Sequence, residues 1–458
     1  MVVSWVHSSP GVTSPIDLML NPVSLFRVLV PGVFLAAGTA FATTVWSIDE
    51  AVTTALEHSP DTQIARERIE GAQAMIAQTD SAWLPQLSLH GGYTETNSPM
   101  MAFGSILNQR AFHFGLDFNQ PGRIDNLNAN GMLAYNLYAG GRATAQRNAA
   151  QAGAAAATHD MQATQQALTA EVVKAILNVQ KARQATVAVE AGVKTYEAAV
   201  DAARARYDSG QMLKADLLSL EVQLAQTRES LIAIRQGAQL AQHAFYFVLG
   251  LEATNERADF MADDPALARL ALPNTLDYST RPEILGLQER LKAAEAMVVA
   301  ARGGRKPTVN AFASYQYDQG WKLNSHGDSW LAGVTVDVNV FDGGVTAGKI
   351  RQTSAEVNQV KAMLRKAQLG IGLEVQQARD THTNALERLS VSAQSVDQAE
   401  ESAALTRARW QSGAVLTAEL IGVESRLIES RLRQTVAQAD ERAALVELRR
   451  ALGLNPII

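Results

Sequence analysis

The stretch from Gly343 to Lys349 has the residue types and spacing of a phosphate-binding loop. It matches the pattern Gly-x-x-x-x-Gly-Lys, follows an expected strand and opens an expected helix. The next residue, Ile350, replaces the Ser or Thr whose hydroxyl would bind magnesium. A related turn at Gly140 and Gly141 is not followed by a matching glycine and lysine. We therefore interpret both glycine pairs as bends between a strand and a helix, and we expect no nucleotide site.

Other reactive side chains give no stronger indication of catalysis. No Ser/His/Asp combination stands out, and the eight histidines show no metal-ligand spacing. Met100, Met101 and His113 occupy one expected loop, where soft ligands could bind copper or silver, but loop methionines usually have no metal role. We expect neither an enzyme nor a cofactor or metal site.

The composition favours long helices over a thick globular core. The chain has 458 residues, of which 47% are hydrophobic but only 6% aromatic. Its formal net charge of -6 and the lack of a basic run argue against a nucleic-acid surface. The chain has no cysteine, which excludes disulfides, thiolate metal sites and a lipid anchor on an N-terminal cysteine.

An apolar run near the N-terminus predicts export from the cytoplasm. Val28 to Ala42 follows one positive charge, Arg27, and ends in an A-x-A cleavage pattern. We expect residues 1–42 to be a signal peptide, with translation starting at Met1 or at Met19; an uncleaved anchor is the alternative. No later stretch reaches about 18 uninterrupted apolar residues, so we expect no helix to span a membrane.

The rest of the chain contains an internal repeat. Tyr138–Gly141 recurs as Phe341–Gly344, and Arg206–Gly210 recurs as Arg409–Gly413, both at an offset of 203 residues. Because nothing was inserted or lost between these landmarks, the helix that joins them has the same length in both copies.

The two copies differ in one loop. Pro60 recurs as Pro282 at an offset of 222, so the first copy holds 19 additional residues, which we place between its paired strands. We expect a first repeat at 43–250, an equatorial linker at 251–281 and a second repeat at 282–458.

Four short stretches alternate apolar and polar residues with the period of a β-strand. Residues 334–341 and 133–138 form one equivalent pair, and residues 87–93 and 309–315 form another, so each repeat supplies one hairpin. The polar rows contain three residues that we expect to line a lumen: Asn136, Asp337 and Asn339. An ordinary soluble sheet with one solvated face is the alternative.

Two proline-free stretches of 66 residues, Arg142–Tyr207 and Val345–Trp410, predict long helical rods. In the first, apolar residues step by four and three from Val189 to Tyr207, which is typical of a coiled coil. Each rod is expected to form a hairpin with a returning helix, Leu213–Leu249 or Leu416–Leu452. The helical stretches expected beside the other half of each rod are Ser47–Ala82 and Arg281–Arg305.

The expected fold is mainly α, with a small membrane β-barrel. One chain offers four strands, whereas closed membrane barrels have at least about eight. Three copies would supply a 12-stranded barrel and would arrange their long antiparallel coiled-coil helices into an α-barrel beneath it. Closure of the sheet therefore predicts a homotrimer embedded in lipid.

Several segments carry a family resemblance in their order and duplication. They are Ala82–Leu87 before the first strand, Val340–Gly344 after the last, and the tips Gly210–Asp216 and Gly413–Glu419. With them the mature chain, from Thr43 to Ile458, resembles the TolC family of outer-membrane efflux proteins. The resemblance implies a trimeric outer-membrane channel with most of its mass in the periplasm. It also implies a periplasmic adaptor on the hairpin tips and an inner-membrane RND or ABC pump that exports small molecules.

The resemblance assigns roles to residues at the two tips. The residues that would contact the adaptor are Arg206, Gly210, Met212, Leu213, Arg409, Gly413, Val415 and Leu416. Asp216 and Glu419 would be carboxylates of the periplasmic entrance, although an acid in the first turn of a helix also suits the helix dipole. Family members often close this entrance with ion pairs, but Val415 and Gly422 replace the partners here, so we do not expect a salt-bridge latch.

Two other functions stay open from the sequence. A duct for type I polypeptide secretion would use the same architecture, and the sequence is nearly silent on the cargo. A soluble periplasmic coiled-coil scaffold would explain the helices but not the alternating strands or the export signal.

Overall fold

The structure is a computed structural model that describes residues 45–252, 258–261, 264, 270, 272 and 277–457. The expected signal peptide at 1–42 and the greater part of the expected linker lie outside the described residues. The elements follow in this order: β1 (Val45–Trp46), α1 (Ile48–His58), α2 (Pro60–Asp80), the short 3-10 helix η1 (Ser81–Trp83), β2 (Gln86–Thr96), α3 (Pro99–Asn108), β3 (Ile124–Tyr138), α4 (Arg142–Asp208), α5 (Lys214–Leu249), β4 (Asp259–Phe260), α7 (Pro282–Gly303), β5 (Thr308–Gly320), β6 (Ser325–Asp337), α8 (Val345–Gln411) and α9 (Thr417–Ala451).

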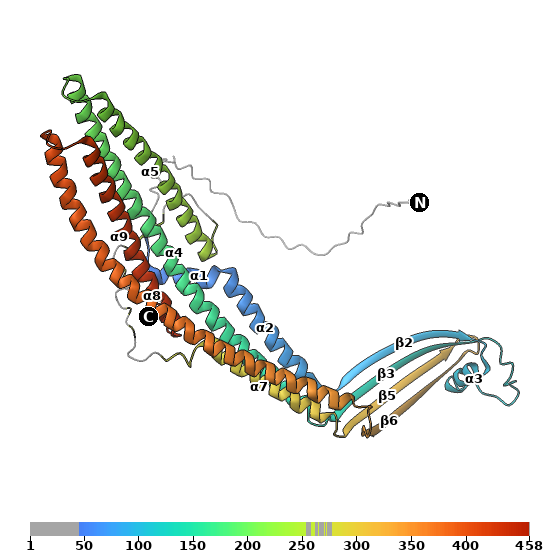
Figure 1. Ribbon diagram of the computed structural model, residues 1–458. Coiled ribbons are helices and arrows are strands. Elements are labelled where there is room, and N and C mark those ends of the chain that lie inside the picture. Colours follow the sequence, from blue (N-terminus) through green and yellow to red (C-terminus); the bar gives the residue numbers. More distant parts are fainter. Residues whose placement is uncertain are drawn as a thin grey trace, which may run out of the picture. The chain divides into compact units, whose positions relative to one another are not determined.

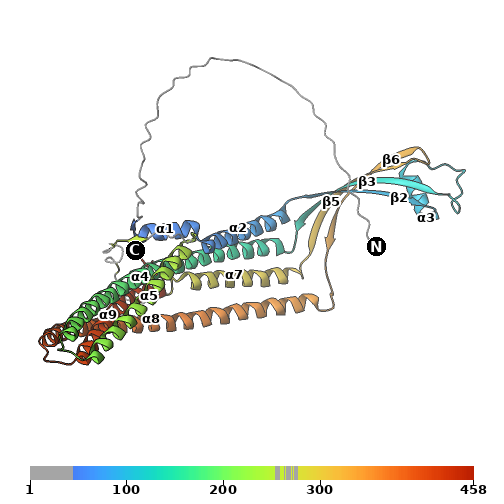
Figure 2. The ribbon, with the colours of Figure 1, turned by 90° about the horizontal axis from the view of Figure 1, so that it is seen from above.

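The two long helices α4 and α8 have 67 residues each and confirm the expected rods to within one residue (Figure 1). Each begins directly after a glycine in the left-handed region, Gly141 with a φ of 81° and Gly344 with a φ of 92°. The returning helices α5 and α9 pack against α4 and α8 in turn, and α2 and α7 lie along the other half of the rods (Figures 1 and 2). None of the described helices is both long enough and apolar enough to cross a membrane.

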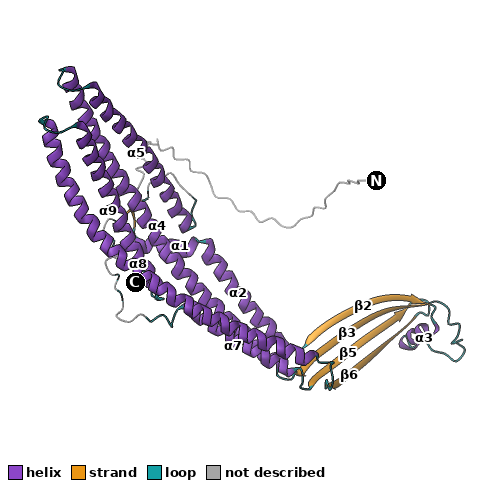
Figure 3. Ribbon diagram, in the orientation of Figure 1, coloured by secondary structure: helices purple, strands orange, loops and turns teal. Residues whose placement is uncertain are grey.

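Strands β2, β3, β5 and β6 form one antiparallel sheet in that order (Figure 3). The pairs β2 with β3 and β5 with β6 are the two expected hairpins, and pairing of β3 with β5 joins them. Within the described part of the chain, β2 and β6 are therefore the edge strands.

The register of the sheet separates an apolar face from a polar face, because cross-strand partners share a face. The apolar face presents large side chains that are exposed in a single chain: Leu87, Leu89, Tyr93, Tyr315, Trp330, Val334 and Val336. The opposite face carries the polar row, which includes Asn126, Asn128, Asn136, Asn310, Gln316, Asp318 and Asp337.

The last strand is shorter than expected. β6 ends at Asp337, so the expected alternation up to Phe341 is wrong beyond that residue, and Asn339 lies in the connection to α8. The partner of Asp337 is Thr308, the first residue of β5. Pro307 precedes it and has no N–H to donate, so the ladder of hydrogen bonds ends there.

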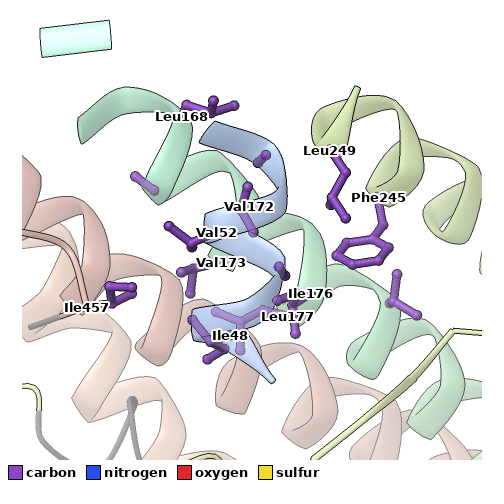
Figure 4. Close-up of a cluster of buried hydrophobic side chains, with 14 of the residues drawn as sticks. Ile48, Val52, Leu168, Val172, Val173, Ile176, Leu177, Phe245, Leu249 and Ile457 are labelled. Atoms are coloured by element: carbon purple, nitrogen blue, oxygen red, sulfur yellow. The ribbon is translucent and has the colours of Figure 1, made fainter. Parts of the chain in front are cut away.

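The helix expected at 47–82 is interrupted. Pro60 lacks the N–H that would continue α1, and the Ser59 hydroxyl instead accepts a hydrogen bond from the Asp61 amide at 3.3 Å and caps α2. The separate helix α1 packs against the middle of α4. Figure 4 shows the resulting cluster, which includes Ile48, Val52, Val172, Val173, Ile176, Phe245 and Leu249.

The connection between β2 and β3, residues 97–123, is much longer than the one between β5 and β6, as expected. It contains α3, which the sequence pattern did not indicate. Gln109, at the end of α3, donates to the Asp125 carbonyl at 2.7 Å and to the Asn126 Oδ1 at 2.8 Å. Since Asn126 belongs to the polar row, α3 lies on the polar face of the sheet.

Candidate functional site: the hairpin tips and the polar face of the sheet

The two hairpin tips have the same backbone geometry. Gly210 and Gly413 adopt φ angles of 73° and 77°, which end α4 and α8 in the left-handed conformation. The Gln211 amide donates to the Arg206 carbonyl, and the Ala414 amide donates to the Arg409 carbonyl, both at 2.8 Å. A glycine is required at both positions because a Cβ is strained at such a φ.

Arg206 connects the first tip to the second. Its guanidinium donates to the Trp410 carbonyl at 2.9 Å and to the Gln411 carbonyl, and it lies 4.8 Å from the centre of the Trp410 ring. Trp410 is only 4% exposed, and its indole N–H donates to the Thr417 hydroxyl at 3.3 Å. The side chain of Arg206 is therefore committed to a contact within the chain.

The residues equivalent to Trp410 and Arg206, which are Tyr207 and Arg409, have different surroundings. Tyr207, which stands where the second copy has Trp410, is 39% exposed and therefore departs from the expected coiled-coil seam, whose members from Val189 to Ala203 are buried. Arg409 is exposed, and among the described residues its guanidinium has no hydrogen-bond or ion-pair partner.

The remaining tip residues divide into packed and exposed groups. Met212 and Val415 pack against the core between the hairpins, whereas Leu213 is 72% and Leu416 is 76% exposed. Two large apolar side chains thus point away from the chain at the tips.

Asp216 and Glu419 lie in the first turns of α5 and α9. Neither carboxylate has a hydrogen-bond or ion-pair partner among the described residues. This placement suits the helix dipole and does not by itself distinguish an entrance ring from ordinary helix termini.

The polar face of the sheet carries a network of buried amides and carboxylates. Asp318 is 1% exposed and accepts hydrogen bonds from Asn126 at 2.6 Å and Asn128 at 2.9 Å. Of the expected lumen residues, Asn136 donates to Asn310 at 2.9 Å on this same face, and Asp337 lies at its end. Sequence analysis missed the part of this network outside the expected strands, which the alternation of asparagines at 126, 128 and 130 could have indicated.

The bend before α8 already satisfies its own helix amides. The Asp342 carboxylate accepts hydrogen bonds from the amides of Gly344 at 3.0 Å and Thr346 at 2.8 Å. Hydrogen bonds from the Thr346 side chain and backbone lower the pKa of Asp342 below its ordinary value. A carboxylate therefore stands where a phosphate-binding loop would hold its anion, in agreement with the interpretation of the glycines as a bend. Within the described residues, no cluster of three or more His, Cys, Asp or Glu side chains could hold a metal ion.

The chain matches the family described as Outer membrane efflux protein over residues 51–251 and 278–454. The chain belongs to this family. Members of the family are channels rather than enzymes, and the resemblance to TolC-like outer-membrane proteins is confirmed.

Individual relatives align with most of the sequence of this outer membrane efflux protein. Protein CyaE of Bordetella pertussis is 27% identical over 419 residues, which cover 88% of this chain and 83% of the relative. Cation efflux system protein CusC of Escherichia coli K12 is 24% identical over 400 residues, 83% of this chain and 80% of the relative.

Solved structures show the same fold. The outer membrane protein VceC of Vibrio cholerae has a TM-score of 0.73 at 19% identity and covers 89% of this chain and 96% of its own. A structure of CusC has a TM-score of 0.76 at 18% identity, and the match covers 89% of this chain and 92% of the CusC chain.

Proposed function

We propose that this outer membrane efflux protein forms a homotrimeric duct through which small molecules leave a Gram-negative cell. Among the described residues the four-stranded sheet has two unpaired edges and an exposed apolar face, and this observation carries the proposal. In lipid every backbone N–H and C=O needs a partner, so the free edges of β2 and β6 must pair with further strands. Three copies of the sheet supply twelve strands, which is above the minimum of about eight for a closed membrane barrel.

The strands and their faces suit such a barrel. They contain 11, 15, 13 and 13 residues, and about 9–11 residues are enough for a tilted strand to cross the hydrocarbon core. The apolar face, with Leu89 and Trp330, would contact lipid. The polar face would line a wet lumen that includes Asn136 and Asp337, with Asn339 at the rim where β6 has ended.

The position of α3 adds a constriction to this duct. Gln109 anchors α3 to the polar face, and the Gly327 backbone lies so close to α3 that a Cβ there would be 2.1 Å from the Asn108 carbonyl oxygen. If the polar face is the lumen, three copies of α3 enter the mouth of the barrel and narrow its exit.

The tips are the proposed docking surface for a periplasmic adaptor. Leu213 and Leu416 offer exposed apolar side chains, and the left-handed turns at Gly210 and Gly413 leave the tip backbone accessible. Met212 and Val415 support these turns from the core side. Arg206 takes part through its contact to the second tip, and the exposed Arg409 remains available to a partner.

Asp216 and Glu419 are proposed to give the periplasmic entrance of the duct an acidic character. In a trimer the first turns of α5 and α9 would recur around the axis and bring six carboxylates to one level. Cations would then concentrate at this opening, because like charges in a cleft attract counter-ions.

The cargo and the pump are proposed from the comparisons. The description of the family names efflux, and the relatives BepC of Brucella suis and CusC are also named as efflux proteins. We therefore place the chain with an inner-membrane RND or ABC pump that handles small molecules, with polypeptide secretion as the competing outcome of the experiment below.

A single cysteine tests this function, because the natural chain has none. The variant Gln211→Cys is cross-linked in cells, and the captured protein is identified by mass. Capture of a periplasmic adaptor of a small-molecule pump supports the proposal, whereas an adaptor of a polypeptide secretion system would reassign the cargo. Extraction into water without detergent, or a monomer by light scattering in detergent, would overturn the duct.

A further inference from the structure

A groove on the first helical hairpin is lined mainly by apolar side chains. It lies between α4 and α5, with one further residue from α9, and has a volume of about 780 Å³. This volume is within the range of small-molecule pockets. The apolar part of its lining includes Ala182, Ala185, Ile234, Leu240, Ala244 and Val248.

The floor of the groove is fixed by the core beneath it. Ala175, Ala241 and Val248 line the groove and also pack against the buried cluster around α1 that Figure 4 shows. Because the lining itself comes from α4, α5 and α9, helix α1 supports the groove without filling it. A groove with a packed floor keeps its shape without a ligand.

The second hairpin has the same construction as the first. An ion pair between Glu197 of α4 and Arg228 of α5 recurs, at the offset of 203 residues, between Glu400 of α8 and Arg431 of α9. Each position of the groove on α4 or α5 therefore has an equivalent on α8 or α9, which can be read from the sequence.

At the equivalent positions the second hairpin is charged. Gly237 of α5 corresponds to Asp440 of α9, and Ala185 of α4 corresponds to Arg388 of α8. Asp440 and Arg388 form an ion pair at 3.3 Å. The packing of a hairpin is thus compatible with charges at these positions, so it does not by itself account for the open apolar groove in the first copy.

Gly237 leaves space at the wall of this groove. It lies in the interior of α5, where glycine is less favourable than alanine. Its φ is not in the left-handed region, and a Cβ at this position would meet no described atom within 4 Å. Neither the backbone nor the described neighbours require a glycine here, and the space beside it is available to a ligand.

The charged residues of the lining are Glu171, Lys174 and Lys181. Lys174 is paired with Glu447, whereas Lys181 is half-buried and its ammonium group has no hydrogen-bond or ion-pair partner among the described residues. Glu171 is ten residues from Lys181, which is about 15 Å along α4. An apolar groove beside one unpaired ammonium group is complementary to an apolar molecule that carries an anion.

The groove lies on the side of α5 that also carries Asp216. Asp216, Gly237 and Ala244 are separated by multiples of seven residues, so they share a face of a helix that packs with the coiled-coil period. This period is seen in the buried residues of α5, which are Leu217, Leu220, Leu224, Thr227 and Leu231. With Asp216 at the periplasmic entrance, as proposed above, the groove opens to the interior of the duct.

We propose that this groove binds an amphipathic organic anion, with the apolar body beside Ile234 and Gly237 and the acidic group at Lys181. The chemical class is an aromatic or alicyclic carboxylate, sulfate or sulfonate. Such a molecule reaches the groove as cargo of the duct, so its role rests on the proposed function, whereas its binding can be measured without transport.

A cysteine in the groove reports its occupancy, because the natural chain has none. The full-length variant Ala244→Cys is placed in lipid nanodiscs and treated with a charged maleimide. The ligand used is 8-anilinonaphthalene-1-sulfonate, an apolar body with one sulfonate. At ten times its Kd it should slow the reaction about tenfold. Ser230→Cys, on the same face of α5 but outside the groove, should react at an unchanged rate.

Two substitutions in the Ala244→Cys background test the chemistry of the site. Gly237→Asp gives the first groove the carboxylate of the second, and the Kd of the sulfonate should rise at least about tenfold, because binding would desolvate that carboxylate. Lys181→Gln should raise the Kd of the sulfonate about threefold and leave that of the neutral analogue N-phenyl-1-naphthylamine unchanged.

Gly370→Asp is the matched control for Gly237→Asp. Gly370 is an exposed glycine in the interior of α8, and a Cβ there would also meet no described atom within 4 Å. It does not line the groove. The Kd of the sulfonate should therefore be unchanged in this variant.

The outcomes separate the site from the duct. Protection that is confined to the groove, weakened by Gly237→Asp and kept in Gly370→Asp supports the site. Equal protection of Ser230→Cys, or an unchanged Kd in Gly237→Asp, overturns it. If Ala244→Cys reacts only after denaturation while light scattering shows a trimer, another copy covers the groove, and the site is wrong while the duct stands. A monomer overturns the duct and the cargo role, and the protection then still decides whether the groove binds the anion.

Discussion

The Arg206 guanidinium lies 4.8 Å from the centre of the Trp410 ring and donates to the Trp410 carbonyl at 2.9 Å. The contact joins the end of α4 to the end of α8, although the two residues are 204 positions apart in the sequence. It supplies a cation to the carbonyls at the end of α8, where the Trp410 carbonyl also accepts a hydrogen bond from the Gly413 amide at 3.0 Å. Arg206 therefore helps to fix the relative position of the two tips.

Replacement of Arg206 by alanine should loosen the second tip. The hydrogen bonds to α8 and the ring contact are lost, at a local cost of about 1–3 kcal/mol. Amide hydrogen exchange of a peptide that spans residues 403–416 should become faster. Arg206→Lys keeps the charge but cannot bond both carbonyls in the plane of a guanidinium, so its exchange should be intermediate. Unchanged exchange in Arg206→Ala would contradict the role of this contact.

The two strand-to-helix bends should respond unequally to alanine. Gly140 and Gly343 have φ angles of 67° and 65°, so alanine at either costs about 1 kcal/mol of conformational energy. A Cβ at Gly140 would also lie 2.5 Å from the Gly303 carbonyl oxygen, whereas at Gly343 nothing lies within 4 Å. Thermal unfolding in detergent should show Gly140→Ala to be clearly the less stable variant. Equal midpoints would show that the bend at Gly140 can move away from α7.

Removal of the buried Arg281 should destabilise the centre of the helical region. Its side chain is 3% exposed and donates to Glu283 at 2.6 Å, Glu374 at 2.7 Å and the Ala451 carbonyl at 3.1 Å. Arg281→Ala removes these hydrogen bonds and leaves Glu374 paired with Arg450 alone, at an expected cost of about 2–3 kcal/mol in the free energy of unfolding.

A surface ion pair provides the control for Arg281. Arg290 and Asp160 are paired at 46% and 38% side-chain exposure, so Arg290→Ala should cost at most about 1 kcal/mol. Both variants are compared by denaturant or thermal unfolding of the detergent-solubilised protein. Similar losses would show that the network around Arg281 is not the stronger of the two.

Stability should fall in acid through Glu447. Burial alone would raise the pKa of its carboxyl, but hydrogen bonds from Arg450 and Lys174 lower it below the ordinary value of 4.5. A pKa that is lower in the folded state adds stability at pH values above the unfolded pKa, and this stability is lost as the pH falls through the folded value.

Unfolding midpoints measured against pH test this expectation. The wild-type midpoint should stay level from pH 7 to about pH 5 and decrease below about pH 4.5. Glu447→Gln should have a free energy of unfolding about 1 kcal/mol lower at pH 7, and its midpoint should decrease less steeply in acid. Parallel curves for the two proteins would assign the acid sensitivity to other carboxylates.

The sequence by itself determined the local elements of this protein. Helices α4 and α8 follow from proline-free stretches between a glycine bend and a glycine tip, and the four strands follow from alternation of apolar and polar residues. These signals are local, because a bend or a side-chain period depends on neighbours within one turn of helix or a few residues of strand. The same local order and its duplication were enough to indicate the family.

Only the tertiary structure decided which residues meet. Pro307 ends the ladder at Asp337 through the register of β5 with β6, and α3 reaches the polar face through Gln109. Equivalent tip residues have different surroundings, since the Arg206 guanidinium reaches the end of α8 and the Arg409 guanidinium has no partner in the part of the chain that the structure describes. Such contacts join residues far apart in the sequence, and their geometry depends on the packing of whole helices rather than on any local pattern.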